Sequence, residues 1–272
     1  LQDLRAQGIA FRPATRITAL EAGEAVTAKG DRIPFDRAVI ATGSAPLRLA
    51  VPGADLPGVQ AYRTHADVAA MLRADGPAVV VGGGLLGLEA ADGLARRGVA
   101  VTVVHPVGWP MERQLDAGAG ALLTRRLGAR RIRFAMPAGL AAIEGEEHAE
   151  AVLLSDGRRI PARLVVMAVG IRPDLALATA SGLATNRGIV VDAAMRTSRP
   201  DVLAIGECAE VEGRTIGLVA PALAQAECAA ATLAGEPRPW MPRADSAALK
   251  VSGTAVWSAG EIAEDAESVT LR

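Results

Sequence analysis

The sequence predicts an α/β fold in which the strands of a parallel sheet alternate with helices. Residues 77–82 (PAVVVG) form an apolar run of the kind that makes a buried strand, and residues 85–97 form an amphipathic helix that Gly98 ends. The same order recurs at 99–105 and 117–129, before another apolar run, LVVMAVG, at 164–170. Strands and helices in this order indicate a parallel sheet with right-handed crossovers.

The flanking segments predict a second domain that this repeating unit interrupts. Residues 15–43 alternate apolar and polar positions, as in a small antiparallel meander, and end in the apolar run AVIAT. Strands at 188–192 and 201–207 and a helix at 221–235 return to that first domain. ALKVSGTAVWSAGE, near the end, indicates two strands of a further domain. The predicted domains are 1–68 with 185–236, 69–184, and 237–272.

Composition and charge exclude several classes of function. The net charge of -1 offers no basic surface for nucleic acid or an anionic membrane. No apolar run reaches the roughly 18–20 residues that cross a bilayer. The cysteines, Cys208 and Cys228, are too few for a four-cysteine cluster or a disulfide scaffold. We therefore expect a cytoplasmic protein with no metal site and with inert, buried thiols.

A glycine-rich turn, GGGLLG, follows the first strand of the repeating unit and matches GxGxxG in the context that this motif requires. Gly82 allows the tight turn, Gly84 allows backbone to approach a pyrophosphate, and Gly87 allows close packing of helix on strand. The helix that starts at Leu85 and Leu86 would direct free N–H groups at the phosphates. A glycine turn without a ligand is the alternative.

Two side chains near this turn carry further expectations. A ribose-binding carboxylate is expected at the end of the second strand, where this chain has His105. An imidazole can hydrogen-bond a ribose hydroxyl and, part-protonated, tolerates a 2′-phosphate, so NADH and NADPH both remain open. A solvated histidine is the alternative. Glu89 is either a carboxylate directed at the nicotinamide or one favoured by the helix dipole.

Two more glycine turns follow predicted buried strands, ATGS at 41–44 and IGECAE at 205–210. Both resemble accessory fingerprints of FAD proteins, in which an acid after the glycine, here Glu207, reaches ribityl or pyrophosphate oxygens. The helix that begins in GLVAPALAQA would then direct its N-terminus at the flavin. Each turn alone has a purely structural alternative.

The order ATGS, GxGxxG, VGIRPD, IGECA and GLVAPA is similar to that of the pyridine nucleotide–disulfide oxidoreductase superfamily. VTVVH, MERQLDAGAG and GECAEVEGRTIGLVAPAL further resemble the flavoprotein portion of assimilatory NAD(P)H nitrite reductase large subunits. Relatives with ferredoxin or rubredoxin reductase activity usually carry Glu in place of His105 and GDCA in place of GECA.

The resemblance implies two interleaved Rossmann-like FAD/NAD(P)-binding domains in three ββα layers, with the FAD domain truncated at its N-terminus and a C-terminal domain begun. It implies hydride transfer from NAD(P)H to FAD and single electrons passed onward, with Glu89 as the catalytic candidate. The implied flavin contacts are Ala41, Thr42, Gly43, Arg63, Gly206, Glu207, Leu218 and Val219. The implied nucleotide contacts are Gly82, Gly84, Leu85, Leu86, Gly87, Glu89, His105 and Gly170.

Three functions remain open at this point. The first is the electron-input module of a nitrite reductase in nitrate assimilation, with a downstream iron–sulfur and sirohaem module as its partner. The second is a ferredoxin or rubredoxin reductase-like protein that serves a small electron carrier. The third is a nucleotide-binding module without turnover. Because the resemblance places another βαβ unit ahead of Leu1, we expect this chain alone to bind NAD(P)H but little FAD.

Overall fold

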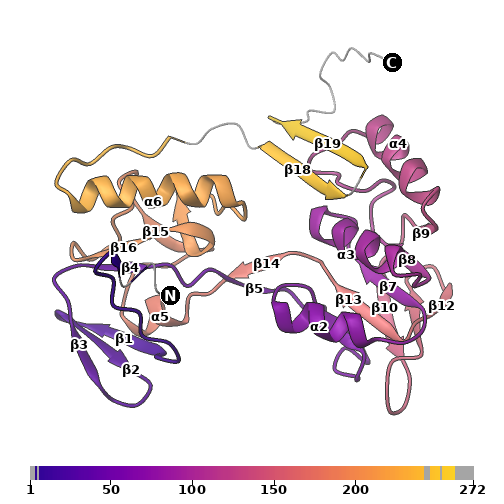
Figure 1. The fold of residues 1–272 in the computed structure, drawn as a ribbon, viewed down its shortest axis with the longest axis horizontal. Coiled ribbons are helices and arrows are strands. Elements are labelled where there is room, and N and C mark those ends of the chain that lie inside the picture. Colours follow the sequence, from indigo (N-terminus) through magenta and orange to yellow (C-terminus); the bar gives the residue numbers. More distant parts are fainter. Residues whose placement is uncertain (1–3, 5, 242–245, 252, 261–272) are drawn as a thin grey trace. The chain divides into compact units, whose positions relative to one another are not determined.

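A computed structural model describes residues 4, 6–241, 246–251 and 253–260 of the chain (Figure 1). The chain divides into two compact units. Unit 1 comprises Leu1–Ala45 and Arg172–Arg243, and unit 2 comprises Pro46–Ile171 and Ala244–Arg272, each as far as it is described. The segments at which the chain passes from one unit to the other, β5 (Ser44–Pro46) and β14 (Ile171–Pro173), pair as a two-stranded sheet.

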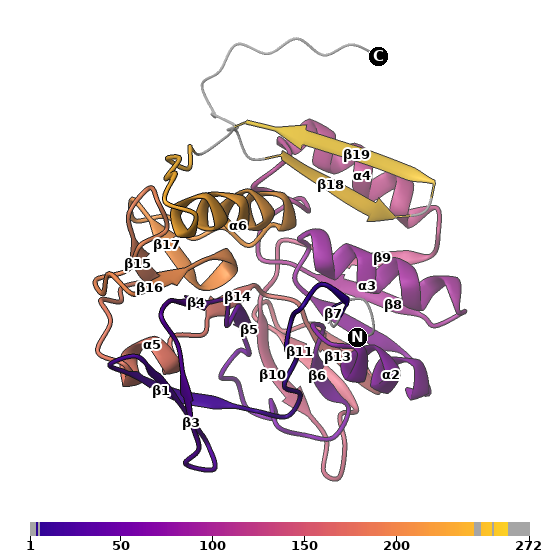
Figure 2. The same ribbon diagram turned by 60° about the vertical axis from the view of Figure 1, so that its left-hand side comes forward.

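Unit 2 is built on a five-stranded sheet in the order β6-β13-β7-β8-β9, visible in Figure 2. Every pairing in this sheet is parallel, as predicted from the alternation of strands and helices. The strands are β6 (Val59–Ala61), β7 (Ala78–Val81), β8 (Val101–Val104), β9 (Ile132–Ala135) and β13 (Leu164–Met167).

Alternate residues of these strands enter two different cores. Ala78 and Val80 of β7 pack with Leu88 of α3 (Leu85–Arg96) and with residues of α4 (Ala117–Gly128). Val79 and Val81 pack instead with the antiparallel sheet of β10 (Leu140–Glu144), β11 (Ala151–Leu154) and β12 (Arg159–Pro161). Because successive strand residues face opposite sides, the parallel sheet is the middle of three layers, which confirms the predicted ββα arrangement.

A helix that the sequence analysis did not predict, α2 (His65–Arg73), follows β6. Thr64 caps it, because its side chain accepts from the Asp67 N–H while the Asp67 carboxylate accepts from the Thr64 N–H, a reciprocal capping box. The spacing of Thr64 and Asp67 was a readable signal. Asp67 also accepts from Arg63 N–H, and these hydrogen bonds lower the pKa of Asp67 although its burial acts in the opposite direction.

Unit 1 has the predicted meander of β1 (Ile17–Glu21), β2 (Glu24–Thr27) and β3 (Arg32–Pro34), all antiparallel. Two parallel pairs accompany it, namely β4 (Ala38–Ile40) with β16 (Val202–Ala204), and β15 (Ile189–Val191) with β17 (Ala209–Val211). The remaining elements are α5 (Ala176–Ala180), the 3₁₀ turn η1 (Gly206–Cys208) and α6 (Val219–Leu233). Ile40, Leu203 and Cys228 share its core.

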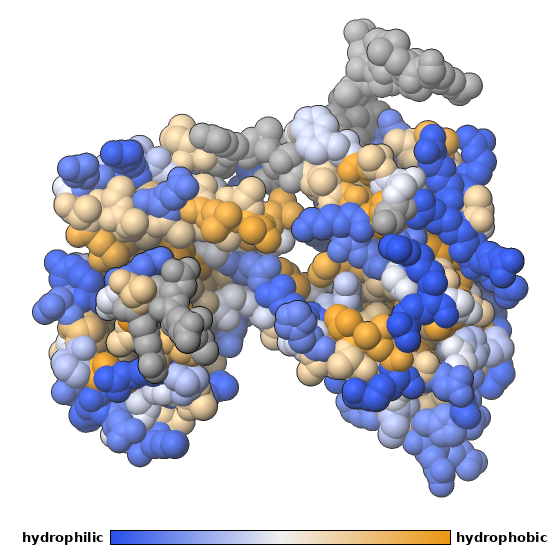
Figure 3. Space-filling model, viewed as in Figure 1, coloured by the Kyte–Doolittle hydropathy of each residue, from blue (hydrophilic) through white to orange (hydrophobic). Residues whose placement is uncertain are grey.

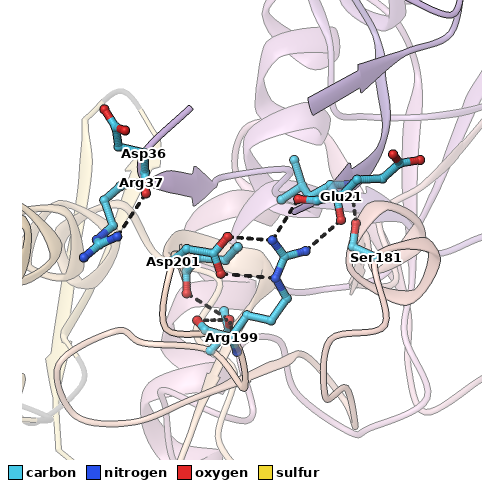
Figure 4. Close-up of polar contacts among 9 residues, drawn as sticks. Glu21, Asp36, Arg37, Ser181, Arg199 and Asp201 are labelled. Atoms are coloured by element: carbon cyan, nitrogen blue, oxygen red, sulfur yellow. Dashed lines mark hydrogen bonds and ion pairs between the residues drawn. The ribbon is translucent and has the colours of Figure 1, made fainter. Parts of the chain in front are cut away.

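Arg199 links the meander to the rest of unit 1 through hydrogen bonds, as Figure 4 shows. Its guanidinium donates to the Leu20 and Glu21 carbonyls at 2.7 and 3.0 Å and to both carboxylate oxygens of Asp201 at 3.2 and 2.6 Å. These hydrogen bonds from Arg199 lower the pKa of Asp201. On the same strand, Leu20 N–H donates to Ser181 Oγ at 2.8 Å.

The compact units meet at 45/46 and 171/172, whereas the predicted domains meet at 68/69 and 184/185. The difference arises because β6 pairs with β13 of the five-stranded parallel sheet, and α5 packs on β1 of unit 1. The predicted tail strands are β18 (Ser246–Val251) and β19 (Thr254–Ala259), a hairpin whose Leu249 and Val251 join the core of α3. The predicted further domain also takes in 261–272, which lie outside the described residues.

Candidate functional site

The glycine turn between β7 and α3 has the geometry that a dinucleotide phosphate requires. Gly82 has φ of +113°, and a Cβ there would lie 2.3 Å from the Ala168 carbonyl oxygen. A Cβ on Gly87 would lie 1.9 Å from the Gly82 carbonyl oxygen, so the helix packs directly on the turn. Gly84, the N-cap of α3, has open space where a Cβ would be and makes no side-chain capping bond. The turn therefore presents open backbone at a helix N-terminus, which fits an anionic phosphate.

His105 lies beneath this turn rather than in solvent, which excludes the solvated alternative. The residue is only 5% exposed. Its Nδ1 accepts from the Gly83 N–H at 3.1 Å, and its Nε2 lies 3.0 Å from Glu112 Oε2. Because Nδ1 accepts, this network assigns the ring hydrogen to Nε2, which donates to Glu112.

The loop after β8 is bonded to the glycine turn through Met111. The Met111 N–H donates to the Gly83 carbonyl at 2.9 Å, and the Met111 side chain is fully buried. Gln114 and Leu115 N–H groups both donate to the Met111 carbonyl at 2.8 Å, which closes a tight turn around Glu112. The Glu112 side chain is 32% exposed, so its carboxylate lies between the buried imidazole and the surface.

Glu89 lies in the early part of α3 and is engaged by the C-terminal hairpin. Its Oε1 accepts from the Lys250 N–H at 3.0 Å. Tyr62, half-buried in the same unit, has a raised pKa, first because of burial and then because of the negative charge of Glu89. The catalytic role of Glu89 stays a prediction.

Unit 1 brings the other two glycine turns together. β4 and β16 are parallel neighbours, so the turns after them lie at the same edge of the sheet. Ser44 Oγ donates to Glu207 Oε2 at 2.7 Å, linking ATGS with IGEC. Gly43 and Gly206 have φ of +69° and +79°, a conformation that side chains disfavour. Thr42 Oγ1 donates to the Asp174 carbonyl at 2.9 Å.

The start of α6 lies against the Gly206 turn. Gln225 Oε1, on a buried side chain, accepts from the Gly206 N–H at 2.7 Å. Leu218 is the N-cap and makes no side-chain capping bond, and Val219 is 74% exposed. The surface over α6 is largely apolar in Figure 3, and it includes Leu223, which is 62% exposed. An apolar surface beside an uncapped helix start and two glycine turns fits the ring end of a flavin.

The remaining predicted residues fall as follows. Ala41 lies between β4 and the Gly43 turn. Gly170 follows β13 with φ of +114°, and its carbonyl accepts from Leu47 N–H. Arg63 precedes α2 and therefore belongs to unit 2, not to the unit that carries the other predicted flavin contacts. Among the described residues, no group of three His, Cys, Asp or Glu side chains is placed to hold a metal.

The chain matches the pyridine nucleotide-disulphide oxidoreductase family over residues 2–226. It belongs to that family. The family assignment confirms the resemblance inferred from the motifs. Cys208 and Cys228 are free and buried, and burial raises the pKa of the Cys228 thiol. The predicted burial of both thiols is therefore confirmed, and their inertness stays a prediction.

Three similar proteins show which members of the family this chain resembles. The chain is 45% identical to the NAD(P)H nitrite reductase of Bacillus subtilis (strain 168), over 91% of this chain and 31% of that protein. It is 39% identical to the assimilatory nitrate reductase electron transfer subunit of the same organism, over 92% of this chain and 33% of that protein. The chain thus spans about a third of these relatives.

The third is a solved structure, the ferredoxin reductase for the CYP199A2 system from Rhodopseudomonas palustris. It superposes with a TM-score of 0.87 at 30% identity, over 94% of this chain and 66% of that one. Together with the family match, this confirms the predicted fold class.

Two polar residues of the candidate sites had no role assigned from sequence. Ser44 lies within ATGS, and Glu112 lies within MERQLD. The available signal for Glu112 was a histidine at the strand end where an acid is expected. Nothing in the sequence paired Ser44 with Glu207 across 163 positions.

Proposed function

We propose that this chain is the electron-input part of an assimilatory nitrite reductase, which takes electrons from NAD(P)H through FAD. The observation that carries the proposal is the open, uncapped N-terminus of α3 at Gly84, held between Gly82 and Gly87 in unit 2. The Bacillus subtilis nitrite reductase and electron transfer subunit support the choice of pathway.

Each unit supplies one half of the proposed machinery. In unit 2, the Gly84 turn binds the nucleotide pyrophosphate, and Glu89 orients the nicotinamide end. In unit 1, the linked turns at Ser44 and Glu207 and the start of α6 hold the flavin. Bound FAD would supply the chemistry that side chains lack, because it accepts an electron pair from the nicotinamide and releases electrons singly.

The proposed partner is a downstream iron–sulfur and sirohaem module, in the cytoplasm. A ferredoxin or rubredoxin reductase-like role is the second candidate, favoured by the ferredoxin reductase that superposes on the chain. The residues His105 and Glu207 support the first candidate, because the reductases of small carriers usually have Glu and Asp at these positions.

Within the described residues, no helix is long and apolar enough to cross a membrane.

Direct binding tests the nucleotide half of the proposal. We expect calorimetric titration of the chain with NADH to give saturable binding, and Gly84→Val to weaken it at least about tenfold, or about 1.4 kcal/mol. Folding should survive, because a Cβ at Gly84 meets nothing within 4 Å. Gly93→Ala is the control, since it changes an exposed glycine of the same helix that is also unobstructed. Equal affinity in a folded Gly84→Val protein would refute the site.

Dye reduction tests the flavin half. In the full-length protein supplied with FAD and NADH, we expect reduction of ferricyanide, which accepts electrons from reduced flavin. A nucleotide-binding module without turnover would reduce none.

A further inference from the structure

The strand-end position of unit 2 that should offer a ribose-binding acid is occupied by a side chain directed inward. A Cβ added to Gly83 would lie 2.9 Å from His105 Cγ, so the imidazole packs directly under the glycine turn. Both ring nitrogens already have partners, Gly83 N–H on one side and Glu112 on the other. The imidazole is therefore occupied in holding the turn and the following loop together.

The carboxylate that this arrangement presents at the rim of the turn is that of Glu112. The His105 side chain is 7% exposed and that of Glu112 is 32% exposed, so the pair leads from the interior to the surface. The Met111 N–H bond to the Gly83 carbonyl fixes the adjoining backbone to the same turn. Only Oε2 of Glu112 contacts His105, which leaves Oε1 as an acceptor.

We propose that Glu112 is the specificity-determining carboxylate of the nucleotide site, accepting from the ribose hydroxyls on the adenosine side, with His105 as its positioning residue. The inference rests on the proposed function. In dinucleotide folds an acid at this edge of the sheet accepts from the 2′-hydroxyl. Here the acid comes from seven residues beyond His105, and the histidine positions it. The site therefore prefers NADH, because a 2′-phosphate would meet a negative charge.

The neighbouring residue provides the rival interpretation. Arg113 is exposed, and it would favour a 2′-phosphate if it, rather than Glu112, were the residue in contact. The two interpretations predict opposite nucleotide preferences, so selectivity decides between them.

The test measures dissociation constants by calorimetry for NADH, NADPH and NADH lacking the adenosine 2′-hydroxyl. For the unaltered chain we expect NADH to bind at least about tenfold more tightly than either of the other two ligands. Glu112→Gln keeps an oxygen acceptor for His105 and removes the charge, so it should abolish most of the preference over NADPH. Glu147→Gln, an exposed glutamate in the loop after β10, makes the same charge change and should alter none of the three constants.

His105 is tested by two substitutions that each keep half of its hydrogen bonding. His105→Asn can keep an acceptor near Gly83 N–H but loses the contact with Glu112, whereas His105→Gln can keep a donor for Glu112. We expect the asparagine variant to lose the preference for NADH and the glutamine variant to retain part of it. A purely structural role would move both affinities together and leave their ratio unchanged.

The outcomes separate this inference from the proposed function. If the chain binds neither nucleotide, both fail. If it binds nucleotides but the unaltered chain favours NADPH or does not distinguish the three ligands, Glu112 is not the ribose acid although the nucleotide site stands. That comparison needs no variant, so it holds even if Glu112→Gln does not fold. A folded Glu112→Gln protein with the original ratio would also overturn the inference.

Discussion

Ser44 donates a hydrogen bond of 2.7 Å to Glu207, joining two turns that lie 163 residues apart in sequence. A hydrogen bond to a charged group contributes about 1.5–3 kcal/mol. We therefore expect Ser44→Ala and Glu207→Gln to be less than additive in a double-mutant cycle of unfolding free energies, with a coupling of about 1 kcal/mol. Denaturant unfolding measures it, and additive effects would mean that the two turns are independent.

The packing of α3 on the glycine turn gives a prediction about stability. Gly87→Ala would place a Cβ 1.9 Å from the Gly82 carbonyl oxygen, and backbone on both sides would have to move. We expect a loss of about 1–3 kcal/mol, the usual cost of overpacking. Gly93→Ala in the same helix meets nothing and should instead stabilise by up to about 1 kcal/mol. Thermal unfolding of the two variants should therefore shift in opposite directions.

The Arg199–Asp201 pair predicts a pH dependence. The hydrogen bonds from Arg199 lower the pKa of Asp201 in the folded chain. The stability that the ionised Asp201 carboxylate contributes is therefore present above its unfolded-state pKa. That stability is lost as the pH falls through the lower pKa of the folded state, below about pH 4.

Asp201→Asn should accordingly lower the melting temperature near neutral pH, and its difference from the unaltered chain should shrink in acid. Asp36→Asn is the control, because it removes the same charge from an exposed side chain of unit 1. A difference that stays constant with pH would contradict the pairing.

Tyr62 offers a spectroscopic reporter of Glu89, since it is the only tyrosine in the chain. Burial and then the Glu89 charge raise its pKa. Glu89→Gln should lower that pKa part of the way towards the ordinary phenol value, because the burial remains. Alkaline titration by ultraviolet absorbance measures the change, and the denatured chain provides the ordinary value. An unaltered titration would place Glu89 away from Tyr62.

The local sequence pattern was sufficient to predict the strands that pack against a hydrophobic core on each face. The apolar run at 77–82 and the glycines that follow it predict a strand, a turn and a helix, because each residue there suits a single kind of element. The edge of the compact unit differs from the predicted boundary near 68 because β6 (Val59–Ala61) is short and is recognised as a strand of the five-stranded parallel sheet only through its pairing with β13. The direction of His105 was beyond the sequence, since an imidazole suits both a buried and a solvated strand end.

The hydrogen bonds around Gly83 have a consequence for attempts to change the coenzyme. The Gly83 N–H donates to His105, the proposed positioning residue of Glu112, and the Gly83 carbonyl accepts from Met111, the residue before Glu112. In the proposed site, phosphate binding and coenzyme choice therefore depend on one connected piece of backbone. A designer who replaces position 105 with an ordinary acid must supply a new acceptor for the Gly83 N–H and release Glu112 in the same step. Single substitutions should therefore understate what paired changes at 105 and 112 achieve.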